Sequence, residues 1–328
     1  MTQQQSAAKQ TICSICLAVH PFAPDALHKL NLHCSRCKLP LTQQEHKKFA
    51  HLDAAVYQHP LDIESMEALK KQPGVQQIIE KLKPLNQQNY AEAFFAANGL
   101  RVTEKQYPAL YAKLQAACRI LGMSKMPNLY VSFESLYGGE FAFSGGEPQP
   151  FIVLNPDIFK YFDDKDILAL IGRELGHMHC HHMPLKATVD NLYVILHKAF
   201  KKNPLSNLAE NISLPVQQAL FTWRLKANLS ADRTAMLVVQ EEKAIFSLLM
   251  KLAGGIDQQA NLEAFVKQAN QLNTQRVDEW LENYWQQFSY QKRVSSFATW
   301  RAAELIAWSR SDRKKGYGYQ DIVKIFSA

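Results

Sequence analysis

The sequence predicts an α+β protein that is mostly helical and has a small cysteine-rich module in front of its main domain. Three observations lead to this prediction: two Cys-x-x-Cys pairs, a few strand-like segments between residues 127 and 154, and long segments with helical apolar periodicity. The chain has 328 residues, of which 47% are hydrophobic and 20% charged. This is the composition of a globular protein that buries a substantial core.

Composition and charge exclude several classes of protein. The net charge of +7 is mild, and the basic residues are scattered except for the run at 310–315, so nucleic-acid binding is not expected. No apolar run approaches the roughly 18 residues that a membrane span needs. The N-terminal residues lack a secretory signal, and four of the six cysteines form Cys-x-x-Cys pairs. We therefore expect a soluble protein in a reducing compartment, the cytoplasm.

The four paired cysteines predict a structural zinc site. Cys13 and Cys16 are separated by 17 residues from Cys34 and Cys37, a spacing that can supply four thiolates to one tetrahedral zinc ion. A redox pair and unligated cysteines are the alternatives. The three nearby histidines could replace a thiolate but are more simply explained as surface residues: His20, His28 and His33. A zinc-ribbon module over residues 1–40 would depend on the metal for its folding.

The rest of the chain divides into a linker and one larger domain. Residues 41–60 are polar and irregular, which is typical of a linker, and 61–328 form the predicted main domain. Helical periodicity over 107–121 precedes two predicted strands. These strands are Pro127–Phe133 and Phe151–Leu154, and the turn-flanked segment 138–146 lies between them.

The most strongly patterned helix covers residues 163–182. Its apolar residues recur at helical spacing, and acidic residues stand in its first turn, where the helix dipole favours them. Its polar residues read Arg173-Glu174-Leu175-Gly176-His177, one substitution from the H-E-x-x-H pattern that aims two imidazoles at one zinc ion. Arginine takes the place of the first histidine. Because a guanidinium is a permanent cation with donors only, it cannot be a metal ligand.

Strand, Phe141-Ala142-Phe143-Ser144-Gly145-Gly146 hairpin, strand and this helix resemble, in that order, the HtpX-like and CAAX prenyl protease family of zinc metallopeptidases. The resemblance covers roughly residues 100–310 and implies a zincin-like fold. Residues 224–233 resemble the family's second metal motif, in which a glutamate is the third zinc ligand; that position is Asn228 here. The family's oxyanion-stabilising His-Pro pair is replaced by Ser295 and Ser296.

The resemblance assigns residue roles that the substitutions call into question. It makes Glu174 the general base, and it places the zinc-ligand positions at Arg173, His177 and Asn228. Around them it places a second set of residues: Asp232, Arg224 and His182. A catalytic zinc needs three protein ligands, and one histidine remains. We therefore expect no catalytic zinc and an idle Glu174.

Arg173 has two alternative predicted positions. The first hypothesis is that its guanidinium replaces the charge of the zinc ion and pairs with Asp232 or Glu174. The alternative is that Arg173 extends to solvent. A separate alternative restores metal binding in a new register, because His177 and His181 stand four residues apart in a cluster that also includes His179, Cys180 and His182.

The sequence thus predicts a degenerate peptidase homologue, a pseudopeptidase, that binds a protein or peptide and holds a structural zinc ion in its ribbon. The resemblance implies that a bound peptide would add an extended strand to the sheet edge near residues 141–144. Two alternatives stay open. One is an active zinc metalloendopeptidase with an altered ligand set, and the other is a nucleic-acid-binding zinc ribbon, which would bind with salt-sensitive affinity.

Overall fold

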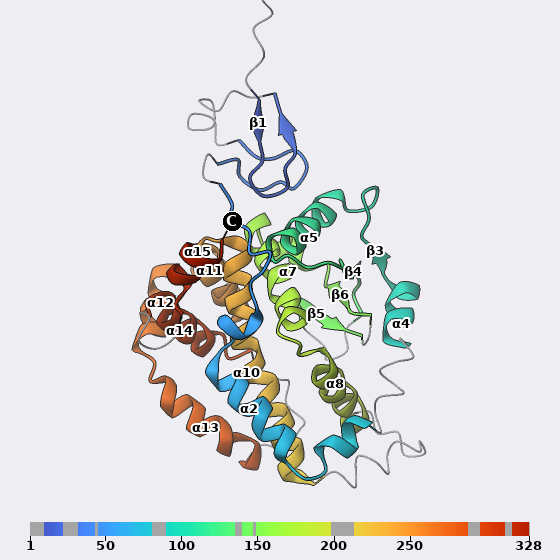
Figure 1. The fold of residues 1–328 in the computed structure, drawn as a ribbon, viewed down its shortest axis with the longest axis vertical. Helices are drawn as coiled ribbons and strands as arrows, with labels where there is room; N and C mark the ends of the chain where they lie inside the picture. Colours follow the sequence, from blue (N-terminus) through green and yellow to red (C-terminus); the bar gives the residue numbers. More distant parts are fainter. Residues whose placement is uncertain are drawn as a thin grey trace, which may run out of the picture.

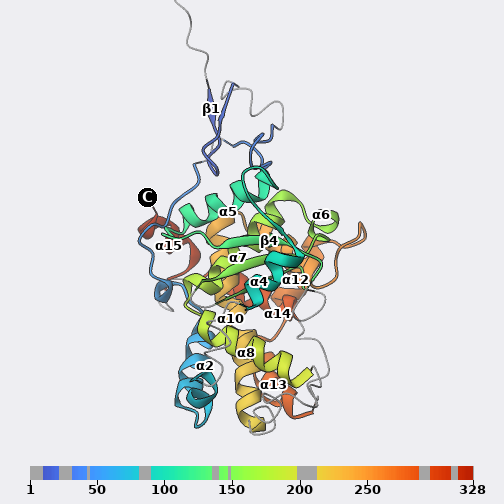
Figure 2. The same cartoon turned by 90° about the vertical axis from the view of Figure 1, so that its right-hand side faces the viewer.

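The computed structural model describes most of the chain, namely residues 10–21, 32–42, 45–80, 90–134, 140–146, 149–197, 213–287, 296–311 and 317–327. A small N-terminal module stands at one end of a larger helical body, which contains one four-stranded sheet (Figure 1). The same arrangement is seen in the perpendicular view (Figure 2). The predicted α+β, mostly helical fold is confirmed. Among the described helices, none has the length and hydrophobicity to cross a bilayer.

The N-terminal module is built from two loops of the same geometry. A short antiparallel hairpin of β1 (Thr11–Ile12) and β2 (Val19–His20) frames the first loop. Its backbone N–H of Leu17 donates to the carbonyl of Cys13 at 2.9 Å, and in the second loop Lys38 donates to Cys34 at the same distance. Leu17 and Lys38 both have positive φ, 62° and 65°. This repeated turn brings each Cys-x-x-Cys pair onto one side of its loop.

The sheet of the body has the strand order β3-β4-β6-β5. β4 (Asn128–Val131) and β6 (Phe151–Leu154) are parallel, and both fall in the predicted strands. β5 (Ala142–Gly145), within the predicted segment 138–146, pairs antiparallel with β6 and forms one edge. β3 (Leu100–Arg101) forms the other edge and was not predicted, because two residues show no alternation.

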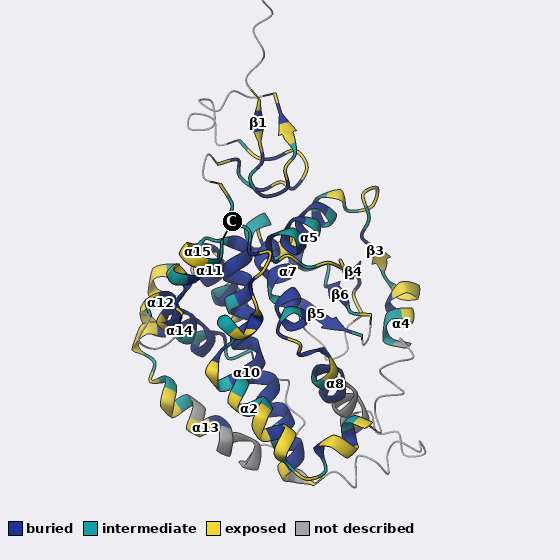
Figure 3. Ribbon diagram, viewed as in Figure 1, coloured by how far each residue is buried: buried dark blue, intermediate teal, exposed yellow. Residues whose placement is uncertain are grey.

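Helices make up the rest of the body. Those before and around the sheet are α2 (Pro60–Lys71), α4 (Tyr90–Asn98), α5 (Pro108–Ile120), α6 (Ile158–Tyr161), α7 (Asp164–His179) and α8 (Met183–His197). Those after it are α10 (Leu214–Val239), α11 (Glu242–Leu252), α12 (Leu262–Gln271), α13 (Thr274–Gln287), α14 (Ala298–Ser309) and α15 (Tyr319–Phe326). α7 and α10 cross at the centre, where nearly every residue is buried (Figure 3).

Two glycines set the distance between α7 and α10. A Cβ atom on Gly176 would lie 2.8 Å from the Thr234 Cβ, and one on Gly172 would lie 3.0 Å from the Val238 Cβ. A methyl group at Gly176 would overlap Thr234, and one at Gly172 would force Val238 to shift by a few tenths of an ångström, so glycine at both positions favours this close crossing. The polar residues that flank these glycines on α7 are thereby pressed against α10.

The predicted linker, 41–60, is packed along the body over its described part. It forms only one 3-10 turn, Ala54–Val56, yet Phe49, Leu52 and Tyr57 are buried. The Phe49 N–H donates to the Ile120 carbonyl at 2.7 Å. The sequence did not reveal this packing, because the apolar residues follow neither a helical nor a strand period. The limits 1–40 and 61–328 stay predictions.

Candidate functional site

The predicted metal-site residues come together where α7 crosses α10. Arg173, Glu174 and His177 are supplied by α7, and Asn228 and Asp232 by α10. We call these five residues the α7–α10 site. Residues 173 and 177 are one turn apart on one helix, as are 228 and 232 on the other, so each pair shares a face. The close helix crossing brings the two faces into contact.

Arg173 lies inside this site. Its Nη1 atom is 2.6 Å from Glu174 Oε1, its Nη2 donates to Asn228 Oδ1, and its Nε is 3.6 Å from Asp232 Oδ1. Only 13% of the side chain is exposed. Burial, followed by the charge of Arg301, lowers the pKa of Arg173, but a guanidinium stays protonated in proteins. The predicted contact with a carboxylate is confirmed, and the alternative that Arg173 extends to solvent is wrong.

Glu174 is fully engaged by neighbours. Its Oε1 accepts a hydrogen bond from Nη1 of Arg173, and its Oε2 accepts a hydrogen bond from Ser144 Oγ on β5 at 2.8 Å. The side chain is 1% exposed. A general base must reach a water or substrate proton through a free oxygen. In this arrangement both oxygens of Glu174 already accept hydrogen bonds.

Asp232 is held mainly by a residue that the sequence analysis missed. Arg301 on α14 donates from Nε to Oδ2 at 2.7 Å and from Nη2 to Oδ1 at 2.6 Å, a bidentate pair with both side chains buried. The remaining guanidinium nitrogen of Arg301, Nη1, donates to the carbonyl of Ser296 at 3.1 Å. Ser295 lies outside the described residues. No pattern in the sequence marks Arg301, because its partner is 69 residues away.

Arg224 and His182 contact members of the α7–α10 site. The Arg224 carbonyl accepts from Asn228 Nδ2 at 3.2 Å, which turns the amide oxygen of Asn228 toward Arg173. His182 Nδ1 is 3.1 Å from His177 Nδ1. His182 Nε2 is in turn 2.9 Å from Asp62 Oδ2.

His177 is buried with one ring nitrogen unused. Its Nε2 has no hydrogen-bond partner among the described residues. Burial is the largest cause that lowers the pKa of His177 well below its usual value, and the charges of Arg224, Arg173 and Lys186 act in the same direction. The imidazole is therefore neutral at pH 7.

These residues do not fit a catalytic zinc ion. A zinc ion beside His177 would meet the guanidinium of Arg173, and the Asn228 oxygen that points inward already accepts a hydrogen bond from that guanidinium. A neutral amide oxygen is also a poor zinc ligand beside imidazole. Of the three ligand positions, Arg173 thus carries a cation that repels the zinc ion, and Asn228 carries a poor ligand that is already hydrogen-bonded. We derive no metal-assisted step from this site.

The residues of the alternative metal site in a new register are held apart in this structure. His179 Nδ1 is 2.7 Å from the hydroxyl of Tyr57, and Cys180 Sγ donates to the same hydroxyl at 3.6 Å. His181 has left the helix with φ 56° and is exposed. Successive side chains of this cluster point in different directions, so they do not converge on one ion.

The four cysteines of the N-terminal module do fit zinc. Their sulfur atoms all lie within 4.8 Å of one another, and within the described residues they are the one group of three or more metal-binding side chains found this close together. The Cys13 and Cys37 sulfurs are 3.8 Å apart, and those of Cys16 and Cys34 are 3.4 Å apart. A zinc tetrahedron with Zn–S bonds of about 2.3 Å has edges of about 3.8 Å.

The four cysteines of the cluster differ in how readily they lose their protons. Hydrogen bonds from Cys13 lower the pKa of Cys16 to about 6 and also lower the pKa of Cys34. The pKa values of Cys13 and Cys37 are raised, so the four sulfurs share protons that a zinc ion would displace. His20 Nε2 is 3.3 Å from Cys34 Sγ, at the rim of the cluster. His28 lies outside the described residues.

Basic side chains attach the module to the body. Lys113 on α5 is 1% exposed and donates to the Cys37 carbonyl at 2.6 Å and to Asp164 at 2.7 Å. Arg119 on the same helix donates to the carbonyl of Ile15. A zinc ion with four thiolates carries a formal charge of about −2. The cationic face of α5 therefore lies where it offsets that charge.

The outer edge of β5 is partly closed. Because the Asn155 N–H donates to the Phe141 carbonyl, the backbone groups of Ala142 and Ser144 point away from β6. The Ser144 carbonyl accepts from the ammonium of Lys186 on α8, which is buried and also pairs with Asp190 at 2.9 Å. Burial lowers the pKa of Lys186. A strand added to this edge would have to displace Lys186 from Ser144.

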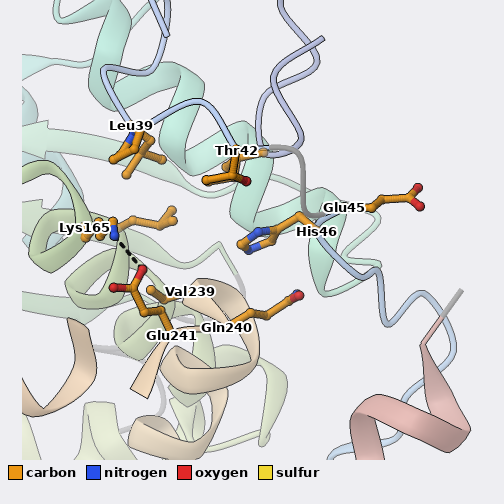
Figure 4. Close-up of a pocket in the computed structure, with 11 residues that line it drawn as sticks. Leu39, Thr42, Glu45, His46, Lys165, Val239, Gln240 and Glu241 are labelled. Atoms are coloured by element: carbon orange, nitrogen blue, oxygen red, sulfur yellow. Dashed lines mark hydrogen bonds and ion pairs between the residues drawn. The ribbon is translucent and has the colours of Figure 1, made fainter. Parts of the chain in front are cut away.

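A cavity of about 80 Å³ lies elsewhere, at the junction of module and body (Figure 4). It is lined by Leu39, Thr42 and His46 on one side and by Gln240 and the ion-paired Lys165 and Glu241 on the other. His46 Nε2 donates to the Val238 carbonyl at 2.7 Å. No residue of the α7–α10 site lines this cavity. With room for only a few water molecules, it is a packing gap at the joint.

Comparison with known proteins identifies the main domain. The family model described as "Peptidase family M48" matches residues 104–290, which include the whole α7–α10 site. The chain is 27% identical over 283 residues to the plastoglobule-localized metallopeptidase 48 of the chloroplast of Arabidopsis thaliana, covering 80% of this chain and 75% of that protein. No solved structure matches the chain significantly. The cytoplasmic location stays a prediction.

Proposed function

This chain belongs to peptidase family M48, and from that premise we propose that it is a member without peptidase activity that binds an extended protein or peptide segment. The observation that carries this proposal is the position of Arg173. Its guanidinium bonds to Glu174 and Asn228, at the two positions where the family resemblance implies a general base and a zinc ligand. The site therefore holds a cation that is part of the chain.

The contacts of Glu174 support the proposed loss of hydrolysis. A peptidase of this type activates a water molecule by lowering its pKa and then removing its proton. Both carboxylate oxygens of Glu174 accept hydrogen bonds, one from Arg173 and one from Ser144, and these contacts disfavour a role as general base. Glu174 and Arg173 together form a structural ion pair.

The binding role is proposed for the edge of β5. This strand contacts the α7–α10 site through Ser144 and Glu174, so an extended segment beside it would pass the site. Ala142 presents its N–H and carbonyl outward, where they can pair with a strand of a partner. Lys186 limits this pairing, because Ser144 becomes available only when the ammonium moves.

The structural zinc ion is the third part of the proposal. Removal of a thiolate by Cys37→Ser is expected to release one zinc ion per chain, because a structural site needs all four ligands. Cys118→Ser is the matched control, since Cys118 is also buried but lies outside the cluster. Retention of zinc by the Cys37 variant would contradict a site made of four thiolates.

Activity and binding are tested with two assays on the full chain. We expect no metal-dependent cleavage of fluorogenic peptides. A chelator should therefore leave the measured cleavage rate unchanged. A peptide array should show binding that Ala142→Pro removes, because proline deletes the outward N–H without touching the β6 ladder, whereas Ala142→Gly keeps it. Cleavage that a chelator stops would instead support the active metalloendopeptidase, and binding unchanged by Ala142→Pro would refute the β5 edge as the binding site.

A further inference from the structure

A buried carboxylate, Asp62, contacts His182, and the family resemblance assigns it no role. It is on α2, upstream of the segment that the family model matches, and it is fully buried. It accepts hydrogen bonds from His182 Nε2 at 2.9 Å, Ser230 Oγ at 2.6 Å, Gln58 Nε2 at 2.9 Å and Trp223 Nε1 at 3.1 Å. Burial alone would raise the pKa of Asp62, but these donors outweigh it and the pKa is lowered. Asp62 is therefore an ionised acceptor.

An ionised Asp62 fixes the proton positions in the two imidazoles beyond it. His182 must carry a hydrogen on Nε2 to bond to Asp62 at 2.9 Å, so in its neutral form its Nδ1 is a lone pair. His177 Nδ1, 3.1 Å from that lone pair, must then carry the hydrogen between the rings. The remaining nitrogen, His177 Nε2, is left as a lone pair. This is the buried atom without a partner among the described residues.

The opposite arrangement is electrostatically unfavourable. A doubly protonated His182 would donate from Nδ1 and force the hydrogen of His177 onto Nε2. That N–H would be buried without an acceptor, on the helix face that also carries the guanidinium of Arg173. The neutral arrangement instead leaves a lone pair at this buried atom, and the positive charge of Arg173 favours the unprotonated nitrogen.

We propose that Asp62 is a positioning residue that acts through His182 to hold His177 Nε2 as an unprotonated acceptor facing the α7–α10 site. The chain thus has, behind His177, the kind of support that metal-binding histidines use, although Arg173 and Asn228 occupy the other two ligand positions. Metal ligands of the histidine type commonly donate their second nitrogen to such a support. The inference rests on the proposed function only in taking the present site to be free of zinc.

The proton positions are measured directly by NMR of the full chain with ¹⁵N-labelled histidine. Wild-type His177 should carry its hydrogen on Nδ1. Asp62→Asn should convert His177 to a mixture of tautomers, because an amide at position 62 can donate to His182 as well as accept from it. Ser230→Ala is the matched control: it removes another partner of Asp62 and should leave the tautomer unchanged.

The wild-type spectrum alone can overturn the inference, so the test does not depend on the variants folding. A hydrogen on His177 Nε2 in the wild type would refute it. An unchanged His177 tautomer in a folded Asp62→Asn variant would refute the role of Asp62.

A second experiment asks whether the retained support still serves a metal. The variant Arg173→His with Asn228→Glu should bind one zinc ion more than the wild type. Adding Asp62→Asn should weaken that ion's binding by about 10- to 100-fold, the usual effect of losing such a support, and adding Ser230→Ala should have little effect. Equal affinity with and without Asp62 would contradict the inference, as would a folded Arg173→His, Asn228→Glu variant that binds no further zinc.

The two proposals fail in different ways. A second zinc ion in the wild-type chain would refute the proposed function and leave the tautomer result to be judged by NMR. A wrong tautomer with no second zinc ion would refute the role of Asp62 and leave the proposed function intact.

Discussion

The buried ion pair of Arg173 and Glu174 has a measurable energetic consequence. Arg173→Met removes the guanidinium, keeps an unbranched apolar side chain, and leaves the buried Glu174 carboxylate with the Ser144 hydroxyl as its hydrogen-bond donor. Loss of one member of a buried ion pair costs about 3–5 kcal/mol, because the other charge stays buried without compensation. We expect about 3 kcal/mol, the lower end of this range, because 13% of Arg173 is exposed and Asp232 keeps Arg301.

A double-mutant cycle isolates the ion pair from the loss of packing. Glu174→Gln keeps the shape of the side chain without its charge, so the variant with both substitutions has no unpaired carboxylate at this position. We expect the two substitutions together to cost less than their separate effects combined, with a coupling energy of about 2 kcal/mol. Additive effects would refute the idea that Arg173 compensates the charge of Glu174.

The assay is urea unfolding followed by tryptophan fluorescence. All five tryptophans lie within residues 223–308, so the signal reports the helical body and not the N-terminal module. Lys160→Met is the control, because it breaks an ion pair with Asp157 that is exposed to solvent, and the unfolding midpoint should not change. An Arg173→Met variant as stable as the wild type would refute the reasoning.

Three further predictions concern packing, pH and metal. Gly176→Ala should destabilise the body by about 1–3 kcal/mol in the same assay, because its Cβ would lie 2.8 Å from Thr234, and Gly172→Ala should cost less. Because burial lowers the pKa of His177 in the folded chain, its contribution to stability is complete above about pH 6.5 and is lost as pH falls below that value, by up to about 1.4 kcal/mol per pH unit. His177→Gln should remove that part of the slope when unfolding midpoints are compared between pH 7.5 and 5. A chelator should abolish hydrogen-exchange protection in residues 10–21 and 32–42 and leave the tryptophan signal unchanged, whereas loss of both would show that the body also depends on the metal.

The parts of the fold that follow a period could be predicted from the sequence. The helix α7 was predicted because apolar residues recur along its whole length and acidic residues mark its start. The cysteine cluster was predicted because ligand spacing in a zinc ribbon is local to each pair. The two-residue strand β3 and the packed segment 45–59 carry no period and were not predicted.

The site was predicted only in part, for a related reason. Arg173, His177 and Asn228 stand at positions that motifs define, so their meeting followed from the family resemblance. The residues that hold them do not belong to any motif: Arg301, Asp62 and Lys186 each act through a partner far along the chain or through a backbone carbonyl. A sequence shows that such residues are charged but does not show which of them are buried together.

The central claim is that Arg173 has taken the place of the metal, and the zinc content of the purified chain beside that of His177→Ala tests it most directly. The account predicts one tightly bound zinc ion in both proteins, held by the four cysteines of the N-terminal module. Two ions in the wild type and one in the variant would contradict it.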